Sequence, residues 1–565
     1  MEDIRIFCEN DSCDHIIPYG TTLRQLSKTA CPYAEDRSII AALVDNTLKE
    51  LDYKVHEPRV VRFIDYDHPD GRRTYIRSLC FVLQNAVNEI YPDKVLVIDY
   101  NLPSGLYCEI RETTPLEDGR PALYFATDEE IAAIKAKMAE IIAKDLPFSK
   151  VKMPNEEALK LFKAKHQTEK VQLLQSLERF TYDVYFLDGK ADTFYGPLAP
   201  STGYLNIFDL TAFKEGFCLQ YPMDGCSGKV LPMKRQSKIA TALGEHSDWC
   251  AIMDTKGVGS LNKKVLEGKI VDLINLSEAL HERRYAKIAD MIYKRRETVK
   301  FVFIAGPSSS GKTSTSKRLA IQCRILGLNP KVIELDNYFV NREDTPRDEN
   351  GEYDFEALGA MDLAFLGEQL NDLLAGKEVE IPKFDFKEGR RTFAGKKMQL
   401  HEKDILIMEG IHALNPAMIP GVDPTKVFRV YASALTSLSL DENNNISTSD
   451  NRMLRRMIRD NRTRGINPEN TIMMWQSVRR GENHNIFPFQ ENADAVFNSA
   501  HIFELPVLKY YAEPLLRRIM PSSPAYTEAV RMLKFLSYII ALSPSEIAAI
   551  PPTSILREFI DGQTL

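Results

Sequence analysis

A glycine-rich stretch in the middle of the chain has the residue types needed to hold phosphate groups. Its glycines let successive backbone N–H groups turn inward, and its lysine adds a mobile charge that can reach the β- and γ-phosphates of a nucleotide. The threonine hydroxyl, at a helix N-terminus, can bind Mg²⁺. We therefore predict a Walker A phosphate loop for ATP and Mg²⁺, built from Gly306, Pro307, Ser308, Ser309, Ser310, Gly311, Lys312, Thr313 and Ser314.

The segments beside this stretch fit the prediction. The apolar run 299–305 precedes it and is typical of a buried strand, and residues 314–326 follow with a helical pattern. The spacing G-x-x-x-x-G-K-T also occurs by chance, and the alternative is a loop without a ligand. The strand and helix on either side favour the phosphate loop.

Two acidic residues follow later apolar strands. Asp336 comes after the strand predicted at 330–335, and Glu409 after the strand predicted at 404–408. Ligands of open α/β sheets lie beyond the carboxyl ends of the strands. We expect Asp336 to accept a proton from a substrate hydroxyl, and Glu409 to hold metal-bound water beside Thr313. The alternatives are a turn or N-cap aspartate and a carboxylate that only caps a strand end.

An arginine-rich segment follows at residues 450–464. On a helix, its arginines fall three or four positions apart on one face, and methionine, leucine and isoleucine cover much of the other. Arginine neutralises charge on a transferring phosphoryl group, so we predict a lid over the phosphate loop. A solvated basic face is the alternative. The arginines are Arg452, Arg455, Arg456 and Arg459, of which we expect Arg455 and Arg459 to be catalytic.

Composition limits the function classes. The 565 residues, with 44% hydrophobic and 27% charged residues, indicate several globular domains. The net charge of −7 argues against extensive nucleic-acid coating. Nine cysteines without a C-x-x-C pair, and ten histidines without metal spacing, indicate neither a disulfide framework nor a zinc site. Without a long apolar run or a signal-peptide pattern, we expect a cytoplasmic protein that does not enter membranes.

The first 60 residues resemble the TGS module, a small β-grasp domain found on threonyl-tRNA synthetases and some GTPases. The resemblance rests on the Pro-Tyr-Gly-Thr-Thr-Leu run at 18–23 and the Ala-Ala-Leu-Val-Asp-Asn run at 41–46. Strands are expected at 4–7 and 40–44, with a helix that begins at Thr22. An unrelated β-rich adaptor is the alternative.

Residues 61–230 resemble the second additional domain of threonyl-tRNA synthetase, which hydrolyses mischarged tRNA. The similarity lies in the helix 75–91, the strand 105–110 and the Gly-Pro loop 192–203. The resemblance places the family's reactive histidines and cysteine at positions occupied here by Arg77, Phe81, Phe194 and Leu198. These side chains provide no ligand set and no general base, so hydrolysis is not expected. We expect ligand sensing, RNA contact, oligomerisation or simple packing instead.

Residues 231–297 read as a helical connector whose basic end is either solvated or binds RNA. Residues 298–520 resemble the uridine kinase and phosphoribulokinase group, and 521–565 read as a helical extension packed on that core. The resemblance implies that Asp336 is the base for a nucleoside 5′-hydroxyl, that Asp354 holds the ribose and that Phe384 lines the base pocket. It also implies substrate contacts for Tyr338, Phe339, Arg390 and Arg452.

The chain departs from that group at two points. The aromatic pair after Asp336 runs Tyr338 then Phe339, the reverse of the usual order. Gly389 stands where the family histidine reads the pyrimidine edge, and Arg390 follows it. Loss of such a partner can change discrimination by orders of magnitude.

We therefore expect a multidomain α/β and α+β protein with a β-grasp domain, an editing-like α+β domain and a parallel-sheet P-loop kinase domain. The expected function is transfer of the γ-phosphoryl group of ATP to the 5′-hydroxyl of a uridine-like or cytidine-like nucleoside. The alternatives are a kinase for another small alcohol, such as a pentose or sugar phosphate, and an ATP-switched RNA-binding regulator.

Overall fold

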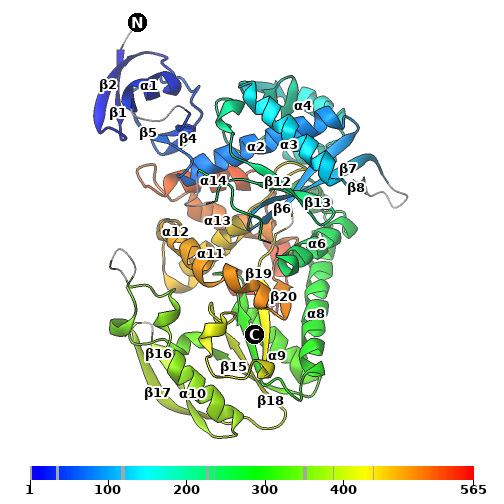
Figure 1. Cartoon of the computed structure of the whole chain (residues 1–565), viewed down its shortest axis with the longest axis vertical. Helices are drawn as coiled ribbons and strands as arrows, with labels where there is room; N and C mark the ends of the chain where they lie inside the picture. Colours follow the sequence, from blue (N-terminus) through cyan, green and yellow to red (C-terminus); the bar gives the residue numbers. More distant parts are fainter. Residues whose placement is uncertain are drawn as a thin grey trace.

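The computed structural model describes residues 3–32, 37–115, 121–223, 228–234, 236–347, 351, 353–385, 387–436 and 438–565. Figure 1 shows the N-terminal domain as a small blue unit at one corner of an elongated molecule. A second domain follows beside it, and the parallel sheet with the phosphate loop lies toward the opposite end. Among the described residues, no helix combines the length and the apolar character needed to cross a membrane.

The N-terminal domain is a β-grasp unit of one sheet and one helix. Its strand order is β2-β1-β5-β3-β4, in which β1 and β5 are parallel and the other pairs are antiparallel. The helix begins with a capping box in which Thr22 and Gln25 exchange hydrogen bonds. The sheet runs four residues past the boundary expected at 60. The elements are β1 Asp3–Cys8, β2 Cys13–Pro18, α1 Leu23–Ala30, β3 Ala41–Val44, β4 Thr47–Lys49 and β5 Arg59–Ile64.

The second domain packs two antiparallel sheets around a long, largely buried helix. That helix, α2 Pro69–Ile90, begins at a proline, which suits the first turn of a helix. The larger sheet has the order β12-β13-β7-β6 with β8 beside β7, and the smaller has the order β11-β10-β9. The other elements are β6 Lys94–Leu102, β7 Gly105–Pro115, β8 Pro121–Tyr124, α3 Asp128–Ala143, β9 Ser149–Pro154, α4 Asn155–Lys163, α5 Thr168–Leu177, β10 Thr181–Leu187, β11 Lys190–Asp192, β12 Asp209–Phe213 and β13 Gly216–Gln220.

Three helices connect this domain to the parallel sheet: α6 Ser237–Ile252, α7 Val258–Leu266 and α8 Ile270–Lys294. Helix α8 runs along one side of the molecule in Figure 1. Its buried residues Ile288 and Ile292 pack in one cluster with apolar residues of the parallel sheet. Helix α8 is therefore packed along one face against the core of the parallel sheet, while its residues Arg283 and Lys287 are exposed.

The C-terminal half is built on a five-stranded parallel sheet of order β15-β18-β14-β19-β20. The central strand β14 Phe301–Ala305 is fully buried, which explains its unbroken apolar sequence. Around it lie α9 Lys312–Ile325, β15 Asn329–Glu334, α10 Leu363–Leu374, the hairpin β16 Val379–Asp385 and β17 Arg390–Met398, β18 Asp404–Glu409, β19 Val427–Ser433, α11 Thr448–Arg464, α12 Pro468–Asn485, β20 Ala495–Asn498, α13 Glu504–Leu516, α14 Tyr526–Leu536, α15 Pro544–Ala548 and α16 Arg557–Ile560.

A loop of the C-terminal half, residues 439–444, inserts into the second domain. The side chain of Asn443 accepts hydrogen bonds from Gln84 Nε2 at 3.0 Å and Gln167 Nε2 at 2.9 Å, and donates one to a backbone carbonyl of β6. Both carboxylate oxygens of Glu442 accept backbone N–H groups at the start of α5. Because this loop leads into α11, the second domain holds the approach to the arginine helix.

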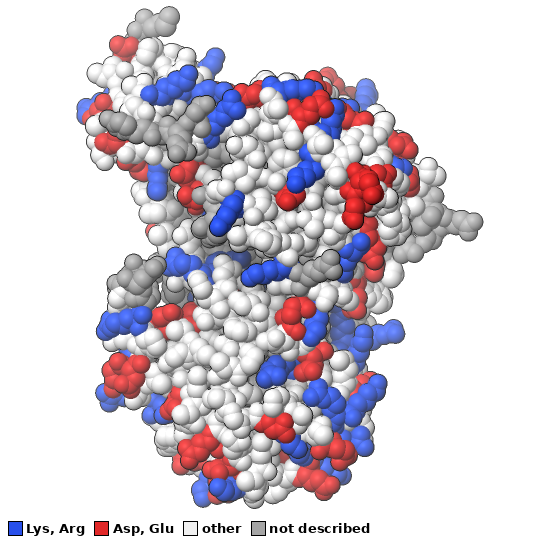
Figure 2. All heavy atoms as spheres, in the orientation of Figure 1, with Lys and Arg blue, Asp and Glu red and all other residues white. Residues whose placement is uncertain are grey.

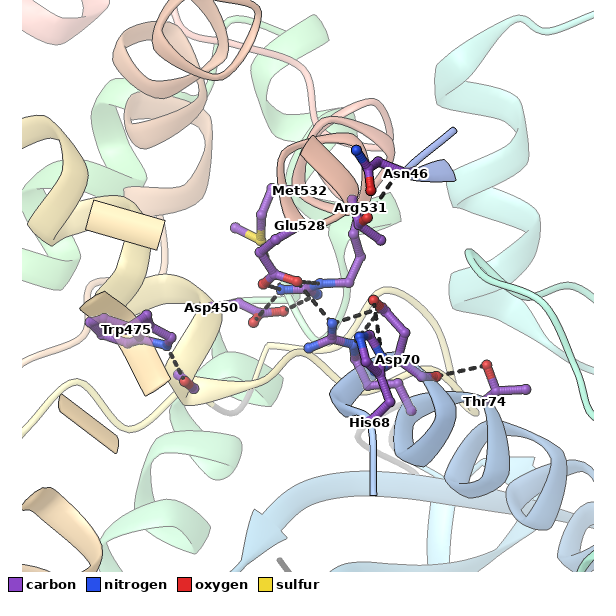
Figure 3. Close-up of polar contacts among 12 residues, drawn as sticks. Asn46, His68, Asp70, Thr74, Asp450, Trp475, Glu528, Arg531 and Met532 are labelled. Atoms are coloured by element: carbon purple, nitrogen blue, oxygen red, sulfur yellow. Dashed lines mark hydrogen bonds and ion pairs between the residues drawn. The ribbon is translucent and has the colours of Figure 1, made fainter. Parts of the chain in front are cut away.

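An ion-pair cluster joins the same two regions (Figure 3). Arg531 of α14 contacts Asp450 of α11 through two hydrogen bonds of 2.8 Å and also pairs with Glu528. Arg73 of α2 bridges Glu528 and Asp70 at 2.8 and 2.7 Å. Although burial alone would raise it, Arg531 and Arg73 lower the pKa of Glu528 to about 2. The charges are therefore paired across α2, α11 and α14.

Replacement of Arg531 should destabilise the protein strongly. In Arg531→Met, Asp450 and Glu528 lose a buried partner, and such a loss typically costs about 3–5 kcal/mol. The matched control is Arg517→Met, because Arg517 is exposed and pairs with Glu513 one turn away. We expect a clear drop in the denaturant midpoint for the first variant alone. Equal midpoints for the two variants would contradict this account.

Candidate active site

The phosphate loop leaves the carboxyl end of β14 and leads into α9. Gly311 has a φ of 80°, a backbone conformation that favours glycine, and α9 begins at the next residue. The Lys312 ammonium lies 3.5 Å from the carbonyl oxygen of Pro307, so it folds back over the loop. The expected strand, loop and helix are therefore present, with the N-terminal N–H groups of α9 at the loop.

Two carboxylates lie beside this loop at the ends of neighbouring strands. Glu409 ends β18 and accepts a 2.6 Å hydrogen bond from the Thr313 hydroxyl. Burial raises the pKa of Glu409 to about 7, against the opposing influence of Lys312 and Thr313. Burial also raises the pKa of Asp336, which follows β15, and Lys312 again opposes the shift. The structure thus brings Asp336 and Glu409 into the electrostatic reach of one lysine.

The donor set at Thr313 and Glu409 fits Mg²⁺. This cation prefers oxygen ligands and is usually held by one or two protein groups, with waters and substrate phosphates completing its shell. A buried carboxylate whose pKa is raised to about 7 is a group that a nearby cation would stabilise in its charged form. Among the described residues, no group of three or more His, Cys, Asp or Glu side chains is arranged for metal binding.

Two further residues near this site were missed by the sequence analysis. Burial, with help from Glu482, raises the pKa of Glu356 to about 7, while Arg456 and Lys312 act in the opposite direction. His412 is only 1% exposed, and burial lowers its pKa to about 4, so its ring is neutral at pH 7. Both lie in irregular segments whose positions depend on tertiary packing. Glu356 stands two residues after Asp354, which is the one local signal that could have indicated it.

The arginine helix α11 is not a lid. Its apolar residues, including Met453, Leu454 and Met457, are buried in a core shared with α13 and α14. On the opposite face, Arg452 and Arg455 are 1% and 0% exposed. The helix is therefore packed on both sides, and opening it would expose a large apolar surface and buried charges. The structure does not fit the expectation of a mobile basic lid, because Arg452 and Arg455 point into the protein.

Two buried arginines, Arg452 and Arg455, contact backbone carbonyl groups of the phosphate loop. Arg452 donates 3.1 Å to the Ser308 carbonyl and forms an ion pair with Glu482. Glu482 in turn accepts the Ser308 N–H at 3.1 Å. Arg455 lies 3.5 Å from the Ser309 carbonyl and pairs with Glu504. In this structure Arg452 thus contacts the loop directly, and Arg455 binds the Ser499 carbonyl at 2.8 Å as well as the loop. Substrate contact by Arg452 and catalysis by Arg455 stay predictions.

The two remaining arginines of this face contact Asp460. Arg459, expected to be catalytic, donates 2.7 Å to the fully buried Asp460, so its charge is already paired. Arg456 also approaches Asp460 but donates 2.9 Å to the Ser308 hydroxyl. Arg456 is thus the arginine of this helix that reaches a side chain of the phosphate loop.

The residues expected to bind the acceptor differ in how deeply they are buried. Tyr338 is 1% exposed, and its hydroxyl donates 2.9 Å to Gln369, so it belongs to the core and its role as a substrate ligand is corrected. Phe339 and Phe384 pack edge to face at 5.7 Å. The backbone N–H of Phe384 binds the Asn337 side chain, which joins β16 to the segment that carries Asp336.

Gly389 stands where the resemblance places a histidine, and its backbone conformation disfavours that residue. Its φ is 69°, and a Cβ atom there would lie 2.7 Å from the Arg342 guanidinium nitrogen Nε. A histidine would be strained and would push this arginine away. The neighbouring Arg390 is largely exposed, with Glu343 at 3.9 Å. Asp354 lies in the segment between β15 and α10, where its carboxylate accepts the Glu356 N–H at 3.0 Å.

The editing-like domain has no open reactive site at the four replaced positions. Phe81 and Phe194 contact each other with ring centroids 5.3 Å apart and are 0% and 4% exposed, and Leu198 is 2% exposed. Arg77 donates 3.2 Å to the Pro197 carbonyl. The structure therefore brings Phe81 and Phe194 into contact, and neither side chain can act as a ligand or a base. Phe194 also lines a cavity of about 250 Å³ together with Tyr195 and Lys534.

With this geometry established, comparison with known proteins identifies the C-terminal region. Residues 301–504 match the model of the Phosphoribulokinase / Uridine kinase family. This region, 204 of the 565 residues, is therefore similar to that family. Among solved structures, a possible uridine kinase from Bacillus stearothermophilus is 19% identical and covers 38% of this chain and 97% of its own, with a TM-score of 0.27. A D-glycerate 3-kinase from Cryptococcus neoformans is 12% identical over 45% of this chain and 87% of its own, with a TM-score of 0.20.

The N-terminal region is similar to threonine–tRNA ligases. That of Azobacteroides pseudotrichonymphae is 27% identical over 199 residues, which are 35% of this chain and 29% of the ligase. That of Methylococcus capsulatus is 25% identical over 261 residues, or 46% of this chain and 38% of the ligase. The chain thus spans well under half of these relatives. The expected combination of synthetase-like modules with a kinase module is confirmed.

The raised pKa of Glu409 should leave a signature in stability. Because this pKa is about 7 in the folded protein and about 4.5 when unfolded, the folded state keeps a proton between these values. Stability contributed by this group therefore falls as pH rises from about 4.5 to 7. Glu409→Gln should remove that loss and be more stable than the unchanged protein at pH 8, by up to about 3 kcal/mol. Urea midpoints at pH 5, 6, 7 and 8 test this, and parallel curves for the two proteins would refute it.

Proposed function

We propose that this protein is an ATP-dependent kinase that phosphorylates a hydroxyl group of a small substrate, with the 5′-hydroxyl of a nucleoside as the first candidate. The family match supports a small-substrate kinase. The observation that carries the proposal is the grouping of Lys312, Asp336 and the Thr313–Glu409 pair at the carboxyl edge of the parallel sheet. This edge is where ligands of such sheets bind.

In the proposed mechanism, the N–H groups of the loop and of the first turn of α9 hold the phosphates of ATP. Thr313 and Glu409 would hold Mg²⁺, which neutralises charge on the phosphates when bound. Lys312 stabilises negative charge on the γ-phosphoryl group as it moves. Asp336 accepts the proton of the substrate hydroxyl, and its raised pKa makes it a stronger base than an exposed aspartate.

The chemical identity of the acceptor is a separate proposal. Phe339 and Phe384 offer an aromatic wall near Asp336, which suits a base or another flat group. The left-handed backbone at Gly389 and the Arg342 side chain beside it disfavour a histidine that would read a pyrimidine edge. Another small alcohol is therefore the second candidate, and the exposed Arg390 nearby favours one that carries a phosphate or another anionic group.

An RNA-binding regulator has less support. Figure 2 shows Lys and Arg interspersed with Asp and Glu over the face in view, without a broad basic surface. Extended RNA contacts generally need a clustered positive surface.

Two substitutions test the catalytic assignment. Asp336→Asn removes the proposed base and should lower turnover by about 10²–10⁴-fold, and Lys312→Ala should also abolish most of it. Asp344→Asn is the matched control because Asp344 is an exposed aspartate eight residues later in the chain. The measurement is ATP-dependent product formation, with thermal unfolding to verify that each variant folds. Activity of Asp336→Asn close to that of the control would remove Asp336 as the base.

A substrate panel tests the acceptor. The purified protein is incubated with ATP and Mg²⁺ and with ribonucleosides, deoxyribonucleosides, small sugars or sugar phosphates, and the products are identified by mass. A phosphorylated uridine or cytidine would support the nucleoside proposal. Phosphorylation of a sugar or sugar phosphate alone would keep the mechanism and replace the substrate. ATP binding without any phosphorylated product would favour a regulator that uses ATP as a switch.

A further inference from the structure

The C-terminal segment 554–565 lies against the helix that begins at the phosphate loop. The Glu558 carboxylate accepts the backbone N–H of Ser314 at 3.3 Å and also the Ser314 hydroxyl. Gln563 Nε2 contacts the same hydroxyl at 2.7 Å. Lys317, on the next turn of α9, donates 3.0 Å to the carbonyl of Leu565. Two side chains of this segment therefore meet at Ser314, the last residue of the predicted phosphate loop.

The core fixes the position of this segment. Ile555 and Phe559 are 1% and 0% exposed, and Phe559 packs under the Arg455 guanidinium at 5.0 Å. The side chain of Ile555 lies against Gly311, where an added Cβ would be only 2.4 Å away. Arg462 of α11 binds the carbonyl of Glu558 at 3.0 Å. The backbone at Glu558 is thus anchored from both α9 and α11, and its half-buried carboxylate is placed at the loop by packing.

The contacted N–H is one that a bound phosphate needs. Helix α9 begins at Lys312, so the N–H of Ser314 is among the first four of the helix and has no partner within it. These N–H groups, with the positive end of the helix dipole, attract anions. Here the anion is the carboxylate of Glu558. A nucleotide phosphate that takes the Ser314 N–H and hydroxyl must displace this carboxylate or accept a like charge beside it.

We infer that Glu558 is a residue of the nucleotide site that substitutes for a phosphate group of the donor when the loop is empty and weakens nucleotide binding by its charge. The inference rests on the proposed function, because it requires that the loop binds a nucleoside di- or triphosphate. Since the backbone of the segment is anchored, displacement involves rotation of the Glu558 side chain rather than release of the segment. Gln563, which is neutral, remains available to hold the Ser314 hydroxyl.

The test compares nucleotide affinity in two charge-neutralising variants of the full chain. Glu558→Gln keeps the shape and the accepting oxygen but removes the charge. The matched control is Asp561→Asn, since Asp561 lies three residues away in the same segment, is exposed, and pairs with Arg462 rather than with the loop. Affinities for ADP and ATP are measured by calorimetry at low and high salt. Thermal unfolding verifies that both variants fold.

We expect Glu558→Gln to bind ADP and ATP about ten-fold more tightly than the unchanged protein at low salt, which lies between the strength of one charge pair in bulk water and that of a pair near a protein surface. The gain should shrink at high salt, and Asp561→Asn should bind as the unchanged protein does. Unchanged or weaker binding in Glu558→Gln would overturn the inference, and weaker binding would make Glu558 a direct ligand of the nucleotide. If the unchanged protein and both variants bind no nucleotide, the proposed function itself fails.

Discussion

The phosphate loop of this protein depends on buried arginine–glutamate pairs. Arg452 and Arg455 are taken out of water, and each is compensated by a buried glutamate and by a carbonyl group of the loop, with the Ser499 carbonyl as a further partner of Arg455. Removing one member of such a pair leaves an uncompensated charge, which is costly in a protein interior. The pairs therefore fix the loop more firmly than its own glycine-rich sequence could, and the catalytic groups are placed relative to this fixed frame.

A rigid frame changes how the acidic groups behave. Glu409 and Glu356 are enclosed near a single mobile lysine, and burial raises the pKa of each to about 7. With pKa values near 7, a bound cation would favour the charged forms of these carboxyl groups and displace their protons. The site is thus arranged to receive positive charge between the strands and negative charge at the helix N-terminus, which is the distribution that a metal-bound nucleotide presents.

The sequence predicted the elements better than the directions of long side chains. The strand, loop and helix around 306–314 and the positions of Asp336 and Glu409 follow from local patterns, because topology alone brings strand ends together. Spacing also placed the arginines of α11 on one face, but it could not show that this face is buried. That fact depends on Glu482 and Glu504, which lie on other helices. Tyr338 was misplaced for the same reason, since its partner Gln369 belongs to α10.

The loop at 439–444 couples the C-terminal half of the chain to the second domain. Asn443 and Glu442 satisfy buried amide and N–H groups of the second domain, and that domain satisfies theirs. Neither half could be separated from the other without leaving unpaired polar groups at the cut surface. A substitution in the second domain that removes one of these partners is therefore expected to disturb the approach to α11, and with it the arginines beside the phosphate loop.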